Sequence, residues 1–143
     1  MTEHNKTYKK RNDFEWEVNS VSKGTDPTAN NKNNMTKLLN STGPGMCLAK
    51  WTQVTMHLGN GTTHSCHHPV AHKIPLEELK NNPGALHNTN HKKQRRKEML
   101  NGERPTECDF CWRVEDNGET SDRILKSLDS FSFKHHDTIA ELV

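Results

Sequence analysis

The chain has 143 residues, of which 29% are apolar and 6% aromatic, and a formal net charge of +2. This predicts one domain with tails and a small hydrophobic core, which a bound metal often supplements, and the charge is too small to predict a polyanion as partner. No stretch has the length of a transmembrane helix and the first residues lack the apolar segment of a secretory signal, so we expect a cytoplasmic protein outside the membrane.

The N-terminal third of the chain is polar. Residues 1–45 are rich in Asn, Thr, Lys and Ser, and they end in the turn-rich stretch Ser41–Gly45. This composition predicts a mostly disordered polar arm. Within it, the alternating segment Phe14–Val18 favours a short strand or a docking segment.

The middle of the chain, residues 46–116, has more apolar residues and is predicted to be the folded domain. Alternation of apolar and polar residues within 50–58 predicts a half-buried strand. Asn60-Gly61 favours a type I′ turn, which returns the chain as a partner strand over residues 62–66. The alternating apolar residues are Val54, Met56 and Leu58.

Helices are predicted after this hairpin. Pro75 suits the first turn of a short helix over residues 76–79. A longer helix is predicted from about Asn88 to Leu100, with Gly102 as its C-terminal stop. Residues 117–143 are polar again and are predicted to be a linker or tail. The expected fold class is α+β, a small metal-stapled domain with a hairpin, helices and a cysteine knuckle. The tail contains one amphipathic turn, formed by Ile124, Leu125 and Leu128.

The four cysteines are the most informative residues of the chain. Cys108 and Cys111 form a Cys-x2-Cys pair, a spacing that lets both sulfurs bind one centre. Cys47 and Cys66 flank the predicted hairpin, whose return brings them together. In a reducing compartment this arrangement favours metal binding over disulfides. We therefore expect one site with Cys47, Cys66, Cys108 and Cys111 as ligands, and a domain whose folding depends on the metal.

The residues by themselves leave the metal open between zinc and an iron–sulfur cluster, because both accept four thiolates. Spacing alone favours a structural zinc, since zinc knuckles are common. Three histidines flank Cys66 and would either replace a thiolate or donate hydrogen bonds to the ligands; they are His64, His67 and His68. Two tryptophans are expected to cover the site and exclude water; they are Trp51 and Trp112.

The compound pattern of Cys47, a spacer, Gly61, four residues, Cys66 and then Cys108-x2-Cys111 resembles the auxiliary-cluster domain of radical S-adenosylmethionine (SAM) enzymes. These domains are the SPASM domain and its shortened twitch form. The match covers about residues 44–127 and looks most like the twitch region of phage and marine-bacterial radical SAM proteins. The segments that carry it are Met46–Trp51, Thr63–Pro69, Arg96–Glu103 and Pro105–Trp112. The resemblance implies that the four cysteines hold a 4Fe-4S cluster.

Two departures from this pattern limit what it implies. The further cysteines with which a full SPASM domain holds a second cluster are absent, so one cluster fits. The radical SAM signature Cys-x3-Cys-x2-Cys is also absent, so no S-adenosylmethionine site is expected in this chain. The resemblance thus implies a non-catalytic N-terminal part or split subunit of a radical SAM enzyme. Its partners would be the catalytic domain, in cis or in trans, and a peptide or small-molecule substrate, which the cluster anchors or supplies with an electron.

A second hypothesis belongs to a different class. A zinc-stapled module could contact nucleic acid through the basic run Lys92–Lys97. Five basic residues on one helix more often form a solvated face, so nucleic acid is the less expected partner. No Ser-His-Asp set, phosphate-binding loop or dinucleotide fingerprint is present, so catalysis by this chain alone is not expected.

Overall fold

The computed structural model describes residues 29–128, 132 and 136–139. The first 28 residues of the predicted polar arm, with its segment Phe14–Val18, lie outside the described residues. The described elements follow in the order α2 (Ala29–Thr42), α3 (Ala49–Thr52), β1 (Thr55–His57), β2 (Thr62–His64), β3 (His72–Lys73), α4 (Leu76–Asn81), the 3-10 helix η3 (Pro83–Leu86), α5 (Asn90–Leu100), the 3-10 helix η4 (Thr106–Cys108), α6 (Asp109–Asp116), α7 (Asp122–Ser127) and α9 (His136–Ile139).

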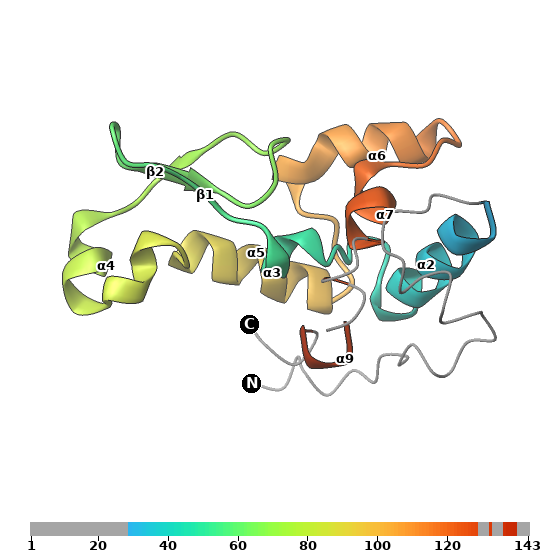
Figure 1. Cartoon of the computed structure of the whole chain (residues 1–143), viewed down its shortest axis with the longest axis horizontal. Helices are drawn as coiled ribbons and strands as arrows, with labels where there is room; N and C mark the ends of the chain where they lie inside the picture. The colour runs from blue at the N-terminus through green and yellow to red at the C-terminus, as the bar shows by residue number, and fades with distance from the viewer. Residues whose placement is uncertain (1–28, 129–131, 133–135, 140–143) are drawn as a thin grey trace.

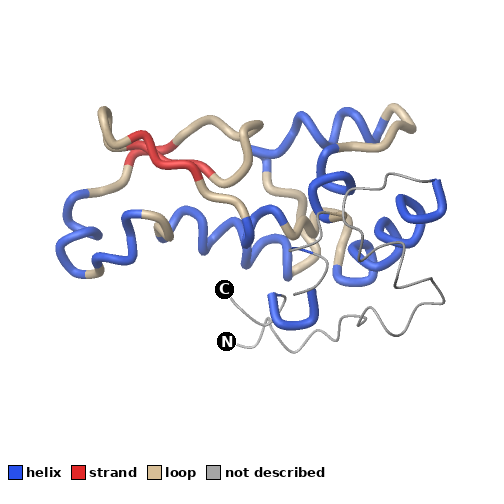
Figure 2. The backbone as a smooth tube through the Cα atoms, viewed as in Figure 1, coloured by secondary structure: helices blue, strands red, loops and turns tan. Residues whose placement is uncertain are grey.

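The fold is α+β, as predicted, and its strands and helices occupy different parts of the molecule. In Figure 1 the sheet and α4 form one end, α2 and α7 lie at the other end, and α5 runs along the lower side between them. Figure 2 shows that the strands are short and that helices make up most of the regular structure. No helix within the described residues has both the length and the apolar character needed to cross a membrane.

The sheet has three antiparallel strands in the order β1-β2-β3. Thr55 pairs with His64, and Thr62 lies opposite both His57 on β1 and Lys73 on β3. The predicted hairpin is therefore present, but β3 was not predicted. The hairpin strand is also shorter than predicted, because residues 49–52 form α3 instead.

The hairpin turn differs from the predicted type I′. That turn needs positive φ at both central residues, whereas among the described residues positive φ occurs only at glycines, here Gly61 with φ of 69°. The N–H groups of Asn60 and Gly61 both donate to the carbonyl of His57, at 3.2 and 2.9 Å. Asn60 therefore keeps ordinary backbone angles, and one glycine completes a longer turn.

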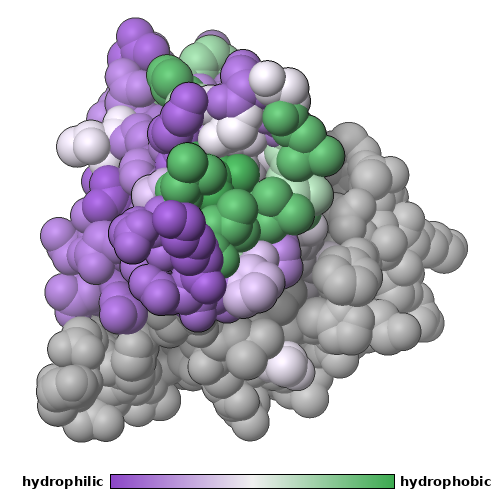
Figure 3. Space-filling model, turned by 90° about the vertical axis from the view of Figure 1, so that its left-hand side faces the viewer, coloured by the Kyte–Doolittle hydropathy of each residue, from purple (hydrophilic) through white to green (hydrophobic). Residues whose placement is uncertain are grey.

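The apolar face predicted for β1 is exposed rather than half-buried. Met56 is 40% exposed and Leu58 70% exposed, and all three residues of β1 are exposed. Figure 3 views the end of the molecule formed by the sheet and α4, and apolar side chains gather there within a polar surround. The exposed large apolar residues of the described chain are Val54, Met56, Leu58, Val70, Leu76, Leu86 and Phe110.

Helix α5 begins and ends on local signals. The Thr89 hydroxyl accepts a hydrogen bond from the Lys92 N–H at 3.2 Å, which caps the N-terminus. At the other end Gly102 has φ of 84°, and the Glu103 N–H donates to the Glu98 carbonyl at 2.9 Å. Together with the bond from the Gly102 N–H to Met99, this is a Schellman cap. The prediction of a helix ending at Leu100 with Gly102 as its stop is confirmed.

The core draws on segments that were predicted to be arm and tail. Helix α2 buries Met35, Leu38 and Leu39 completely, because positions i, i+3 and i+4 share one face of a helix. Helix α7 buries Ile124 at 2% exposure. Residues 29–45 and the α7 segment therefore belong to the folded unit. The core residues are Met35, Leu38, Leu39, Met46, Leu48, Met99, Leu100, Cys108, Cys111, Trp112, Ile124 and Leu128.

The connection from α2 to α3 lies directly on the segment after α5. A Cβ atom on Gly43 would lie 2.7 Å from the Gly102 Cα, and one on Gly45 would overlap the Glu103 carbonyl. Only glycine permits this approach of two backbones. The contact fixes the chain two residues before Cys47 and so positions the first cysteine.

Candidate metal centre

Cys47, Cys66, Cys108 and Cys111 line one cavity. About 390 Å³ of this cavity is not filled by protein atoms, and part of that space opens to solvent. All four residues are free cysteines. The structure thus brings together the four residues that the sequence predicted for one site.

Each cysteine comes from a different structural context. Cys47 precedes α3, where the Leu48 N–H donates to Ser127 Oγ on α7 at 3.0 Å. Cys66 follows β2, and its carbonyl oxygen lies 2.7 Å from His64 Nδ1. Cys108 ends η4 and Cys111 lies in the first turn of α6, a separation of three residues that puts both sulfurs on one side of a helical turn.

The most compact group of potential metal ligands beside the cavity does not consist of cysteines. Among the described residues, the set of three or more potential ligand atoms within 4.8 Å of one another is formed by His67, His68 and Asp122. No three cysteine sulfurs meet that limit. A tetrahedral zinc site holds its sulfurs about 3.8 Å apart, from metal–sulfur bonds of about 2.3 Å. Thiolates at separate irons of a cubane are about 6 Å apart or more.

Burial favours the neutral thiol form of Cys47, Cys108 and Cys111 in the metal-free chain. Burial raises the pKa of Cys108 to about 12 and that of Cys111 to about 11. Burial, and next the neighbouring Cys66, also raise the pKa of Cys47. Since thiolates rather than thiols bind metals, loading this site must release protons.

A buried lysine contacts the cysteines. Lys50 is 4% exposed, and its Nζ lies 3.4 Å from Cys108 Sγ and 2.5 Å from Glu107 Oε2. The other Glu107 oxygen lies 2.5 Å from His91 Nε2. A cation here stabilises negative charge on the thiolates. Sequence reasoning missed Lys50, although a lysine inside the apolar segment Met46–Trp51 was a signal that could have indicated it.

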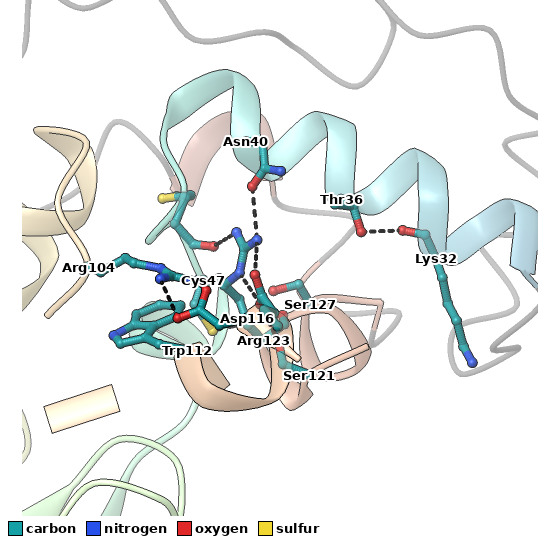
Figure 4. Close-up of polar contacts among 12 residues, drawn as sticks. Lys32, Thr36, Asn40, Cys47, Arg104, Trp112, Asp116, Ser121, Arg123 and Ser127 are labelled. Atoms are coloured by element: carbon teal, nitrogen blue, oxygen red, sulfur yellow. Dashed lines mark hydrogen bonds and ion pairs between the residues drawn. The ribbon is translucent and has the colours of Figure 1, made fainter. Parts of the chain in front are cut away.

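A second buried cation joins the elements around the cavity (Figure 4). Arg123 is 2% exposed and pairs with both Glu115 oxygens, at 2.8 and 2.9 Å. It also donates to the Met46 carbonyl and to Asn40 Oδ1, each at 2.9 Å. Helices α2, α6 and α7 and the residue before Cys47 therefore meet at one guanidinium. Arg123 and Lys126 also line the cysteine cavity, and nothing in the local sequence marked either.

The histidines beside Cys66 have different positions. His68 lines the cavity, and its Nε2 lies 2.6 Å from Asp122 Oδ2. Its ring stacks on Phe110 with 4.1 Å between the centroids. His67 is exposed, and neither it nor His64 lines the cavity. His68 is therefore the histidine placed to act on the cysteine ligands.

The two tryptophans predicted to cover the site also differ. Trp112 lines the cysteine cavity, and its indole N–H donates to the Pro105 carbonyl at 2.7 Å. Trp51 packs against the core but lines a neighbouring cavity instead. Only the Trp112 placement agrees with the prediction.

The basic run on α5 is not a continuous solvated face. Lys92 and Arg96 are 3% and 6% exposed, while Lys97 is exposed. Two of the five cations are thus turned inward, and the surface charge available to a nucleic acid is reduced accordingly.

Neither the family models nor the curated proteins nor the solved structures compared with this chain give a match.

Proposed function

We propose that this chain is an auxiliary 4Fe-4S domain of a radical SAM protein, and that Cys47, Cys66, Cys108 and Cys111 hold the cluster. The observation that carries the proposal is the convergence of all four cysteines on one cavity. They come from three places in the chain: before α3, after β2 and at the junction of η4 with α6. The resemblance of the cysteine pattern to twitch domains favours a cluster over zinc.

The residues around the cavity fit a negatively charged, thiolate-bound centre. Lys50, Arg123 and Lys126 line it together with the cysteines. A Lys50 N–H donates to Cys108 Sγ at 3.4 Å, and a hydrogen bond of this kind to a ligand sulfur stabilises the reduced centre and raises its potential. The Asp122 carboxylate, which also lines the cavity, lies 2.6 Å from His68 Nε2. The potential ligands are thus soft sulfur atoms, and the cations around them would compensate the negative charge of bound thiolates.

The apolar part of the lining limits the access of water. Trp112 and Met99 are 7% and 1% exposed, and the indole is fixed by its hydrogen bond to the Pro105 carbonyl. Low solvent access is one of the factors that set the potential of an iron–sulfur centre. When bound, a 4Fe-4S cluster supplies one-electron transfer or a ligation point for substrate.

The proposed partner is a radical SAM catalytic domain, in cis or in trans, acting on a peptide or small molecule. The Cys-x3-Cys-x2-Cys signature is absent from these 143 residues, so reductive cleavage of S-adenosylmethionine is assigned to that partner. A domain with four ligand thiols suits the reducing cytoplasm, where cysteines remain available for metal.

Anaerobic purification of the full chain tests the proposal. We expect iron and acid-labile sulfide at about four of each per chain, and a broad absorbance at about 400 nm that dithionite bleaches. Cys47→Ser should lower the iron content sharply, whereas Ser65→Ala should leave it unchanged. A colourless protein with one zinc ion per chain and no sulfide would overturn the proposal and support the zinc module instead.

A further inference from the structure

A second cavity lies beside the cysteine cavity and has a different lining. It contains about 620 Å³ of space not filled by protein atoms, part of it open to solvent. Lys50 lines both cavities, so one buried lysine separates them. The residues of the second cavity are Lys50, Trp51, Gln53, Val54, His87, Asn88, Lys92 and Arg96. Three of these are cationic side chains, and none is a carboxylate.

The two α5 cations of this cavity are buried, and no described residue forms an ion pair with Lys92 or Arg96. Lys92 Nζ donates to Thr63 Oγ1 at 2.8 Å and to the His87 carbonyl at 2.9 Å, both neutral acceptors. Arg96 donates to Asn88 Oδ1, and its buried Nε has no hydrogen-bond partner. Both side chains thus keep donors that no described residue satisfies.

Burying such charges is costly unless something compensates them. Burial, and next the charge of Arg96, lower the pKa of Lys92 to about 8. Burial likewise lowers the pKa of Arg96. The Glu107 carboxylate pairs with Lys50 and His91 instead. The described residues therefore place no carboxylate in direct contact with Lys92 or Arg96.

We propose that this second cavity binds a small organic oxyanion, a carboxylate or a phosphate ester, between Lys92 and Arg96 with its planar part against Trp51. A guanidinium presents parallel N–H donors that match two oxygens of such a group, and an ammonium adds a compact charge. Trp51 lines the same cavity, and the Arg96 guanidinium carbon lies over its ring at 5.9 Å from the centroid, so ring and cation belong to one wall of the cavity. The inference does not depend on what the cysteines bind.

Calorimetric titration of the full chain tests the inference with three probes of similar shape: benzoate, phenyl phosphate and neutral benzamide. We expect one molecule of benzoate or phenyl phosphate to bind per chain, at least tenfold more tightly than benzamide, at constant ionic strength. The better of the two anions identifies the carboxylate or the phosphate as the natural group. Equal binding of all three probes, or of none, would overturn the inference.

Neighbouring residues on α5 offer matched controls. Arg96→Gln should weaken anion binding at least tenfold, whereas Arg95→Gln, whose side chain pairs with Glu98 at 2.9 Å, should change it less than twofold. Equal losses in both variants would indicate a general charge effect and overturn the specific site. If Arg96→Gln does not fold, Gln53→Glu decides: it keeps the shape of a lining residue but adds a carboxylate to the cavity. This variant should abolish anion binding, and unchanged binding would overturn the inference.

Discussion

The two neighbouring cavities differ in what they lack. The cysteine cavity holds four thiols whose donors converge, and its cations Lys50 and Arg123 are paired with Glu107 and Glu115. The second cavity holds Lys92 and Arg96 without any carboxylate on its lining. We propose a soft metal centre for the first arrangement and an anion for the second. Lys50 lines both cavities, and after burial and the charge of Arg96 its positive charge contributes to the lowered pKa of Lys92 in the second cavity.

The largest effect is expected from removing two of the proposed metal ligands in the cysteine cavity. Cys108→Ser combined with Cys111→Ser should remove the metal and unfold the shared core of residues 29–128, because metal binding supplies folding free energy to a small core. Circular dichroism and metal analysis measure both losses. Lys97→Ala is the control, since this exposed residue does not line the cavity. A metal-free double variant with a native spectrum would show that the core folds independently.

Paired and unpaired buried arginines can be compared directly. Arg123→Met should lower the free energy of unfolding by about 3–5 kcal/mol, because it removes the guanidinium partner of the half-buried Glu115 carboxylate. Arg96→Met leaves no carboxylate behind and should change it by less than about 1 kcal/mol. Urea denaturation measures both, with the exposed Arg113→Met as control. Equal losses for Arg123 and Arg96 would contradict the distinction between the cavities.

A smaller effect concerns the chain before Cys47. Gly45→Ala should lower the free energy of unfolding by about 1–3 kcal/mol, because its Cβ would overlap the Glu103 carbonyl. The metal content should fall together with the stability, because the close contact between Gly45 and Glu103 positions Cys47. Gly59→Ala has open space around its Cβ and should be nearly neutral in thermal denaturation. Equal stability of the two variants would show that the 43–45 segment can move away.

A pH dependence of metal binding is also expected, and it leaves the fold itself unchanged. The folded pKa values of Cys108 and Cys111, about 12 and about 11, lie above the ordinary value of 9.0. Both thiols therefore hold their protons at neutral pH, and metal must displace them. The affinity for Zn²⁺ as a probe ion should rise about tenfold per pH unit for each displaced proton between about pH 6.5 and 8. Competition titrations measure the slope. Cys108→Ser should reduce it by one proton, and a flat profile would contradict the raised pKa values.

Local signals explain which parts of the fold were predictable. Helix α5 was predicted within two residues of its observed start because Thr89 and Gly102 act on the backbone next to them. The hairpin followed from Asn60-Gly61, although the turn type did not, since Asn60 keeps negative φ. The prediction of a half-buried face on β1 was wrong, because alternation shows that a strand has two different faces but does not show what covers either of them.

The sequence by itself determined the donor set: four cysteines at spacings that suit one site, and an α+β frame that could hold them. Only the tertiary structure decided which polar residues lie inside. Helix α2 enters the core through three apolar positions in an otherwise polar segment, which average composition conceals. Lys50, Lys92, Arg96 and Arg123 all read as surface residues in the sequence, yet each is at most 6% exposed. A buried charge depends on partners far along the chain, as Arg123 does on Asn40, and no local pattern encodes a contact of that kind.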